Sequence, residues 1–168
     1  ANGHNVLGLA RSDHSAEKLR QLGAGALLGD LESPEVLRYG ATVSDAVIHL
    51  GFMHDFSRFA EACAIDRVAI EILGAAIENT KKPLIVTAGV TFLDAAGPIT
   101  IESDQAFPPS DEYPRASEAA AKALSDQGIM TSVMRLPPSV HGVGDHGFIP
   151  FLIDIARQKG VSAYAGEG

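Results

Sequence analysis

The feature that most constrains the fold is an alternation, along the whole chain, between short apolar runs and segments with helical periodicity. Because neighbouring parallel strands need a crossover connection, this alternation predicts an α/β fold with a parallel sheet. The expected strands are apolar on both faces, which is typical of a doubly wound sheet in a three-layer α/β/α arrangement. We expect strands over 5–10, 25–30, 45–52, 83–89 and 131–137, and helices over 15–23, 33–40, 57–79, 114–127 and 148–160.

Composition limits the classes of protein to consider. The 168 residues fit one domain, and the net charge of -8 without a basic run argues against a nucleic-acid partner. No apolar stretch is long enough to span a membrane. The single cysteine, Cys63, cannot form an intramolecular disulfide, which fits a reducing, cytoplasmic compartment, and its alanine-rich surroundings predict a core position.

Ligands of open parallel sheets bind beyond the carboxyl ends of the strands, so the residues that follow each expected strand are candidates for a binding site. In chain order they are Arg11, Ser12, Asp30, Leu31, Leu50, Gly51, Phe52, Thr87 and Pro137.

Several of these segments together resemble a known family. "LARS", "GDL", "AVIHLGF", "LIVTAG", the helix near 113–127 and "VMRLPPSVHGVG" are similar, in order and spacing, to the extended short-chain dehydrogenases/reductases of the epimerase/dehydratase branch. His141 stands where that family carries a tyrosine. The resemblance implies a Rossmann-like domain whose dinucleotide contacts Arg11, Ser12, Asp30, Leu31, Leu50, Gly51, Phe52 and Pro137.

The family's first strand and its glycine-rich turn are not found in this sequence. We therefore expect residues 1–168 to form a single, incomplete NAD(P)-binding domain from the interior of a longer protein. The alternative is a trimmed variant with a rearranged sheet. By the resemblance, the missing strand would lie between the strands expected at 5–10 and 45–52.

Arg11 bears on which cofactor binds. The family places an acidic residue at this position to bind the adenosine ribose of NAD, whereas a guanidinium there can bind the 2′-phosphate of NADP. We therefore expect NADP(H), with NAD as the other possibility. The alternatives are a surface arginine paired with Asp13 and, for Asp30, a turn-forming role instead of a contact with adenine.

The family's catalytic residues are only partly present. Tyr113 occupies the place of the catalytic tyrosine, and Ser117 stands at the position of the lysine that lowers the tyrosine pKa, so the resemblance makes both of them catalytic candidates. Gly89 replaces the usual hydroxyl residue, which leaves Thr87 as a nearby candidate. On a helix from 114 to 127, Lys122 would not face Tyr113, and we expect Arg115 to face away from it.

The histidines offer another chemistry. His49, His54, His141 and His146, with Asp55 and Asp145, follow or end expected strands and could gather at one rim of the sheet. His141 or His146 could then replace the missing acid/base group, or the histidines of "HGVGDHG" could only form hydrogen bonds with the backbone. Their spacing matches no tight metal-ligand motif, so we predict no metal site.

These observations leave three functions. The first is an NAD(P)-dependent oxidoreductase or epimerase acting on a small carbonyl or sugar-like substrate. The second is a non-enzymatic NADP(H)-binding sensor, and the third a metal-dependent hydrolase. The resemblance also implies a possible homodimer through the helices 57–79 and 114–127.

Overall fold

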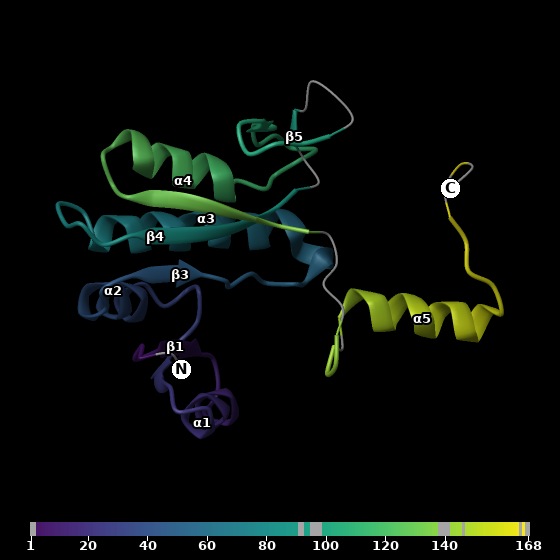
Figure 1. Cartoon of the computed structure of the whole chain (residues 1–168), viewed down its shortest axis with the longest axis horizontal. Helices are drawn as coiled ribbons and strands as arrows, with labels where there is room; N and C mark the ends of the chain where they lie inside the picture. The colour runs from purple at the N-terminus through teal and green to yellow at the C-terminus, as the bar shows by residue number, and fades with distance from the viewer. Residues whose placement is uncertain are drawn as a thin grey trace. The chain divides into compact units, whose positions relative to one another are not determined.

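The computed structural model describes residues 3–90, 93–94, 99–137, 142–145, 147–164 and 166. The chain divides into two compact units, Ala1–Leu136 and Pro137–Gly168. The second unit contains one helix, α5 (Phe148–Lys159), which ends at Gly160 in the left-handed conformation. Among the described residues, the first unit contains the strands and the other helices (Figure 1).

The strands of the first unit form parallel pairs. Strand β1 (Leu7–Ala10) pairs with β2 (Gly25–Leu28), and a second sheet has the order β3-β4-β7, made by Val47–His49, Leu84–Gly89 and Thr131–Leu136. A short antiparallel pair, β5 (Leu93–Asp94) and β6 (Gln105–Ala106), lies in a segment where the sequence predicts only loop. The predicted α/β class with parallel strands is confirmed.

The helices follow the predicted order with different ends. They are α1 (Asp13–Gln21), α2 (Pro34–Val43), α3 (Phe59–Ala76), which follows a short 3-10 turn at Phe56–Arg58, and α4 (Ser117–Asp126). Helix α2 continues past the predicted stop at Gly40, because a glycine inside a helix weakens it without ending it. Helix α4 begins at Ser117 instead of Pro114, which leaves Tyr113 outside the helix.

Helices α2, α3 and α4 form one layer, in which α3 contacts both of the others, while α1 packs on β1 and β2. The core between this layer and the strands includes Ile70, Ile77, Leu84 and Val86, all fully buried. Cys63 is also buried, as predicted, and burial raises the pKa of its thiol, so the thiol is neutral. The opposite sheet face leaves apolar side chains exposed in the described part of this unit, among them Ile48 at 61% and Met134 at 53%.

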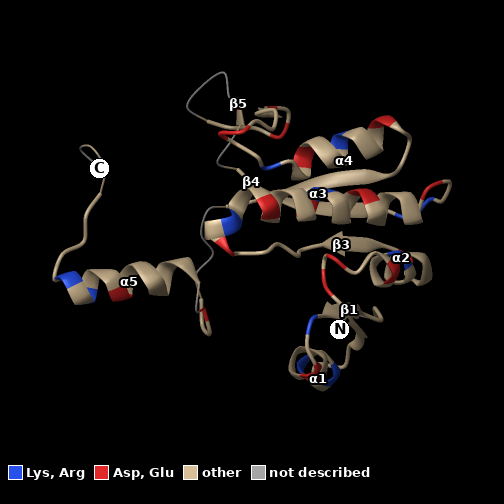
Figure 2. Cartoon of the chain, turned by 180° about the vertical axis from the view of Figure 1, so that it is seen from behind, with Lys and Arg blue, Asp and Glu red and all other residues tan. Residues whose placement is uncertain are grey.

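Charges of both signs are interspersed along the helices (Figure 2). Many form pairs one helical turn apart, such as Arg38 with Glu35, Arg67 with Glu71 and Lys122 with Asp126. None of the described helices is long and apolar enough to cross a membrane.

The α3–α4 contact depends on Gly74, where an added Cβ would lie 2.5 Å from the side chain of Leu124. We expect Gly74→Ala to lower the free energy of unfolding by about 1–3 kcal/mol, because the extra methyl overpacks the interface. Chemical denaturation measures the effect. Gly142→Ala is the matched control, because a methyl there meets no atom within 4 Å. Equal stability of the two variants would contradict the packing described here.

Candidate active site

The carboxyl ends of the parallel strands carry most of the predicted site residues. Thr87 on β4 donates a hydrogen bond from Oγ1 to the carbonyl oxygen of His49 on β3, at 2.9 Å. This bond uses the only proton of the Thr87 hydroxyl and leaves its lone pairs as acceptors. In this arrangement Thr87 stabilises the strand ends, and its catalytic role stays a prediction.

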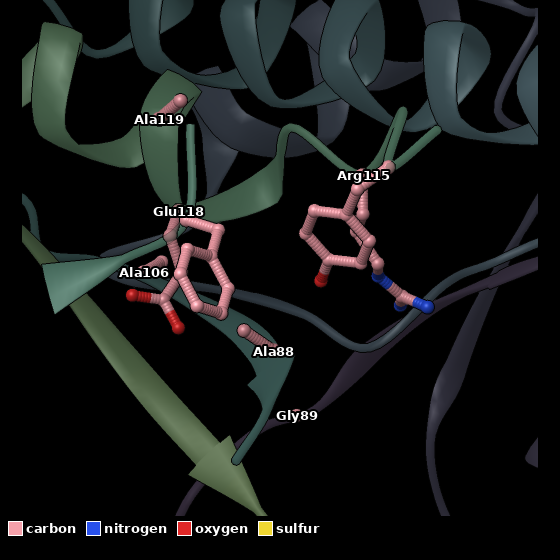
Figure 3. Close-up of a pocket in the computed structure, with 8 residues that line it drawn as sticks. Ala88, Gly89, Ala106, Arg115, Glu118 and Ala119 are labelled. Carbon is pink, nitrogen blue, oxygen red and sulfur yellow. The ribbon is translucent and has the colours of Figure 1, made fainter. Parts of the chain in front are cut away.

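Tyr113 lies beside the end of β4. A reciprocal pair of hydrogen bonds fixes its backbone to Ser110, with Ser110 N donating to the Tyr113 carbonyl at 2.8 Å and Tyr113 N donating to Ser110 Oγ at 3.1 Å. The ring lines a small cavity of about 20 Å³, which has room for roughly one water molecule. The other lining residues are Ala88, Gly89, Ala106, Phe107, Arg115, Glu118 and Ala119. In Figure 3, Glu118 and Arg115 lie on either side of Ala88 and Gly89.

Arg115 occupies a position that the sequence did not predict. We expected it to face away from Tyr113, but both side chains line the same cavity. That expectation assumed a helix through Tyr113, whereas α4 begins only at Ser117. The Arg115 guanidinium lies 4.0 Å from the ring centroid of Phe52, a cation–π contact. Its Nε is buried without a hydrogen-bond partner among the described residues.

The environment of Tyr113 determines the state of its hydroxyl. Burial raises the pKa of Tyr113 above the ordinary value of 10.0, the positive charge of Arg115 opposes that rise, and Glu118 and Cys63 add to it. The hydroxyl therefore stays protonated at neutral pH. A tyrosine in this state can donate a proton but is a poor base.

Glu118 is held by an arginine on the neighbouring strand. Arg135 on β7 donates from Nε to Glu118 Oε1 at 3.1 Å and from Nη2 to Oε2 at 2.8 Å. The same guanidinium donates to the backbone carbonyls of residues 101, 102 and 104. The bidentate pair raises the pKa of Arg135 and fixes this wall of the cavity to the sheet.

Ser117, at the place of the family's lysine, points into the core. Its Oγ donates to Asp66 Oδ2 at 2.6 Å, and Asp66 Oδ1 lies 2.8 Å from His49 Nε2. All three residues are buried, with exposures of 2% for Ser117, 2% for Asp66 and 5% for His49. The network joins α4, α3 and β3 beneath the site. The catalytic role expected for Ser117 stays a prediction, but its hydroxyl is engaged in this network.

The expected gathering of histidines takes a different form. His49 is bound to Asp66 inside the core, while His54 makes edge contacts with Phe52 and Phe56, at centroid distances of 5.5 and 6.3 Å. Asp55 accepts hydrogen bonds from Ser57. His141 and His146 lie outside the described residues. Within the described ranges, no group of three or more His, Cys, Asp or Glu residues could hold a metal ion.

Arg11 and Ser12 directly follow β1. Arg11 is exposed and forms no ion pair within the part of the chain that the structure describes, so the alternative pairing with Asp13 is not seen. Ser12 is the N-cap of α1, and its side chain accepts a hydrogen bond from Ser15 N at 3.2 Å. The Arg11 guanidinium is therefore available to an external anion.

The remaining cofactor candidates follow the next strands. Asp30 forms a turn, with its Oδ1 accepting from Glu32 N at 3.0 Å and from Ser33 Oγ at 2.7 Å. Leu31 packs against Gly51, where an added Cβ would lie 3.0 Å from a Leu31 methyl. Leu50 is 70% exposed, and Phe52 lies beneath Arg115. Pro137 directly follows β7 as the first residue of the second unit.

Sequence comparison finds relatives over nearly the whole chain, although no family model matches it. An uncharacterized protein of Schizosaccharomyces pombe is 42% identical over 99% of this chain and 56% of its own length. A 4-hydroxy-2-methyl-3-oxo-4-farnesyl-3,4-dihydroquinoline-1-oxide ketoreductase of Stigmatella aurantiaca is 29% identical over 95% of this chain and 50% of its own. A 2-alkyl-3-oxoalkanoate reductase of Stenotrophomonas maltophilia is 25% identical over 99% of this chain and 52% of its own length. The chain thus spans about half the length of these relatives.

Solved structures share the fold. The Bordetella bronchiseptica enzyme WbmH, in complex with NAD+, superimposes with a TM-score of 0.69 at 14% identity, over 95% of this chain and 56% of its own. UDP-glucose 4-epimerase from Bifidobacterium longum, in complex with NAD+ and UDP, superimposes with a TM-score of 0.60 at 16% sequence identity. The match covers 80% of this chain and 46% of the epimerase chain. Citrobacter sp. triphenylmethane reductase, in complex with NADP(H), superimposes with a TM-score of 0.50 at 15% sequence identity. The match covers 77% of this chain and 39% of the reductase chain. The resemblance to the short-chain dehydrogenase/reductase family is confirmed. The domain has the Rossmann-like fold of its NAD(P)-dependent members.

Sequence reasoning missed Asp66, Glu118 and Arg135, and it misplaced Arg115. Asp66 stands inside the apolar stripe of a long helix, and an acidic residue there signals a buried partner. Proline disfavours the helical conformation of the residue before it, so Pro114 indicates that Tyr113 lies outside the helix. It gives no signal that the helix begins only after Arg115.

The Asp66 network yields a stability prediction. We expect Asp66→Ala to lower the free energy of unfolding by about 3 kcal/mol, because His49 and Ser117 would lose their shared acceptor inside the core. Urea denaturation measures the loss. Asp126→Ala, which removes an exposed partner of Lys122, is the control and should change stability little. If Asp66→Ala lowered the free energy of unfolding no more than Asp126→Ala does, the buried network would contribute no more to stability than an exposed ion pair.

Proposed function

We propose that this chain is the dinucleotide-binding part of an NADP(H)-dependent reductase that acts on the keto group of a small molecule. The observation that carries the proposal is the cavity at the carboxyl end of β4, lined by Tyr113, Arg115 and Glu118. Ligands of this fold bind at that edge of the sheet. Two relatives with named activities are a ketoreductase and an oxoalkanoate reductase, which favours ketone reduction over sugar epimerisation.

The residues at the strand ends fit a dinucleotide. A Cβ at Gly51 would lie 3.0 Å from the Leu31 side chain, so these two candidates, which follow different strands, lie against each other at one edge of the sheet. The exposed Arg11 suits the 2′-phosphate of NADP. Ser12, Leu50, Phe52 and Pro137 follow the same strands and would contact the remainder of the cofactor, while Asp30 would shape the turn beside it.

In the proposed reaction, Tyr113 donates the proton. NADPH, when bound, supplies a hydride to the carbonyl carbon of the substrate. The π electrons of the carbonyl move to its oxygen, and that oxygen takes the proton from Tyr113 Oη. Solvent then returns a proton to the tyrosinate. Because Tyr113 is protonated at neutral pH, the site suits reduction.

A second candidate function is a non-enzymatic NADP(H)-binding sensor. It is favoured by Ser117, which stands at the place of the family's lysine but is bound to Asp66 in the core. Consumption of NADPH in the presence of a ketone separates the two functions, since a sensor binds without turnover. A cytoplasmic setting and a homodimer through α3 and α4 are further parts of the proposal.

The cofactor assignment predicts a selective effect of Arg11→Ala. In the full-length protein, we expect the variant to bind NADPH about 10-fold more weakly or worse, because it loses a charge-assisted bond to the 2′-phosphate. NADH affinity should not change. Nicotinamide fluorescence measures both, and Arg20→Ala on α1 is the control for lost surface charge. An equal loss for both cofactors would contradict the assignment, and no binding by the wild-type protein would overturn both functions.

The acid role of Tyr113 predicts the effect of Tyr113→Phe. We expect its kcat for ketone reduction to fall by about 100-fold or more, with unchanged NADPH affinity. In the wild type, activity should persist as the pH rises and decline only when the pH passes the raised pKa of Tyr113, above 10.0. Tyr164→Phe is the control, because Tyr164 is exposed in the second unit. Full activity in Tyr113→Phe would assign proton transfer to another group.

A further inference from the structure

We propose that Arg115 is a catalytic residue of this site, supplying the positive charge beside Tyr113 and binding the substrate oxygen that Tyr113 protonates. The inference rests on the proposed reductase function and adds a residue to it. In the family that the chain resembles, a lysine four residues after the tyrosine has the charged role. Here the serine at that position is buried against Asp66.

The other cations near the cavity are already paired. Lys122 Nζ lies on the exposed side of α4, 2.7 Å from Asp126 Oδ2. Arg135 is held by both oxygens of Glu118 and by backbone carbonyls. Arg115 differs from both, because no hydrogen bond or ion pair joins it to another described residue.

The surroundings of Arg115 preserve its charge for a ligand. Phe52 supports the guanidinium through its ring face, a contact that uses no N–H group. A guanidinium is more weakly hydrated than an ammonium group, which suits a partly buried position. Its buried Nε lacks an acceptor, and such a donor is costly until one arrives. Arg115 lines the cavity, so a carbonyl oxygen held there would lie beside its side chain.

The geometry also fits the chemistry of reduction. As hydride reaches the carbonyl carbon, negative charge develops on the carbonyl oxygen, and a fixed cation beside it stabilises that charge. Arg115 and Tyr113 line the same cavity, so one oxygen atom there can meet both side chains. Proton transfer then leaves a tyrosinate, which the same guanidinium stabilises until solvent reprotonates it.

The first test needs no substrate. The chain has three tyrosines, Tyr39, Tyr113 and Tyr164, whose ring carbons can be labelled with 13C and titrated by NMR. The Tyr113 signal is assigned by its loss in Tyr113→Phe. In Arg115→Met, which keeps a long apolar side chain on Phe52, we expect the Tyr113 titration to move to higher pH while Tyr39 and Tyr164 are unchanged. Arg20→Met is the control and should shift no signal. An unmoved Tyr113 signal in Arg115→Met would overturn the inference.

The second test uses turnover by the full-length protein with NADPH and ethyl acetoacetate, a simple ketone ester, as probe. We expect Arg115→Met and Arg115→Gln to lower kcat by about 100-fold with unchanged NADPH affinity, and Arg115→Lys to recover part of that loss. Lysine keeps the positive charge and glutamine does not. Equal kcat values in Arg115→Gln and Arg115→Lys would therefore contradict the proposal that the charge of Arg115 assists the reaction. Absence of NADPH binding in the wild type would instead overturn the proposed function, and the tyrosine titration would still decide whether Arg115 acts on Tyr113.

Discussion

The Asp66 carboxylate is the contact on which the arrangement of the site depends. Its two oxygens meet His49 of β3 and Ser117 of α4, and Asp66 itself belongs to α3, so one buried group joins a strand and two helices. Apolar packing alone is non-directional and leaves helices free to slide along a sheet. Hydrogen bonds in a buried environment are directional and costly to break, so they fix the register of these elements.

That register places the residues around the cavity. Ser117 is the first residue of α4, and the segment carrying Tyr113 and Arg115 immediately precedes it. Fixing Ser117 therefore fixes where this segment leaves the helix. From the other side, the Arg135–Glu118 pair ties the first turn of α4 to β7. Two contacts therefore hold the segment that lines the cavity: the buried Ser117–Asp66 hydrogen bond and the partly buried Arg135–Glu118 pair.

Much of the fold followed from the sequence because hydrophobic periodicity and crossover topology depend on local pattern. The strands and helices appear in the predicted order, and the strand ends carry the expected residues. The site was harder to predict, since it depends on where one helix begins. A start at Ser117 instead of Pro114 moves Tyr113 off the helix and brings Arg115 to the cavity. The contact between His49, Asp66 and Ser117 joins residues far apart in sequence, and the local pattern indicates only that Asp66 has a buried partner, not which residues it meets.

The support of Arg115 by an aromatic ring, and not by a carboxylate, leaves its positive charge without a counter-ion among the described residues. The chain carries a net charge of -8, so an approaching phosphate meets repulsion at distances near the Debye length of about 8 Å. The field of a cation without a counter-ion falls off more slowly with distance than the field of an ion pair. The charges of Arg115 and of the exposed Arg11 therefore offset part of this repulsion close to the site, and added salt weakens the long-range repulsion more than it weakens the contacts of a bound ligand.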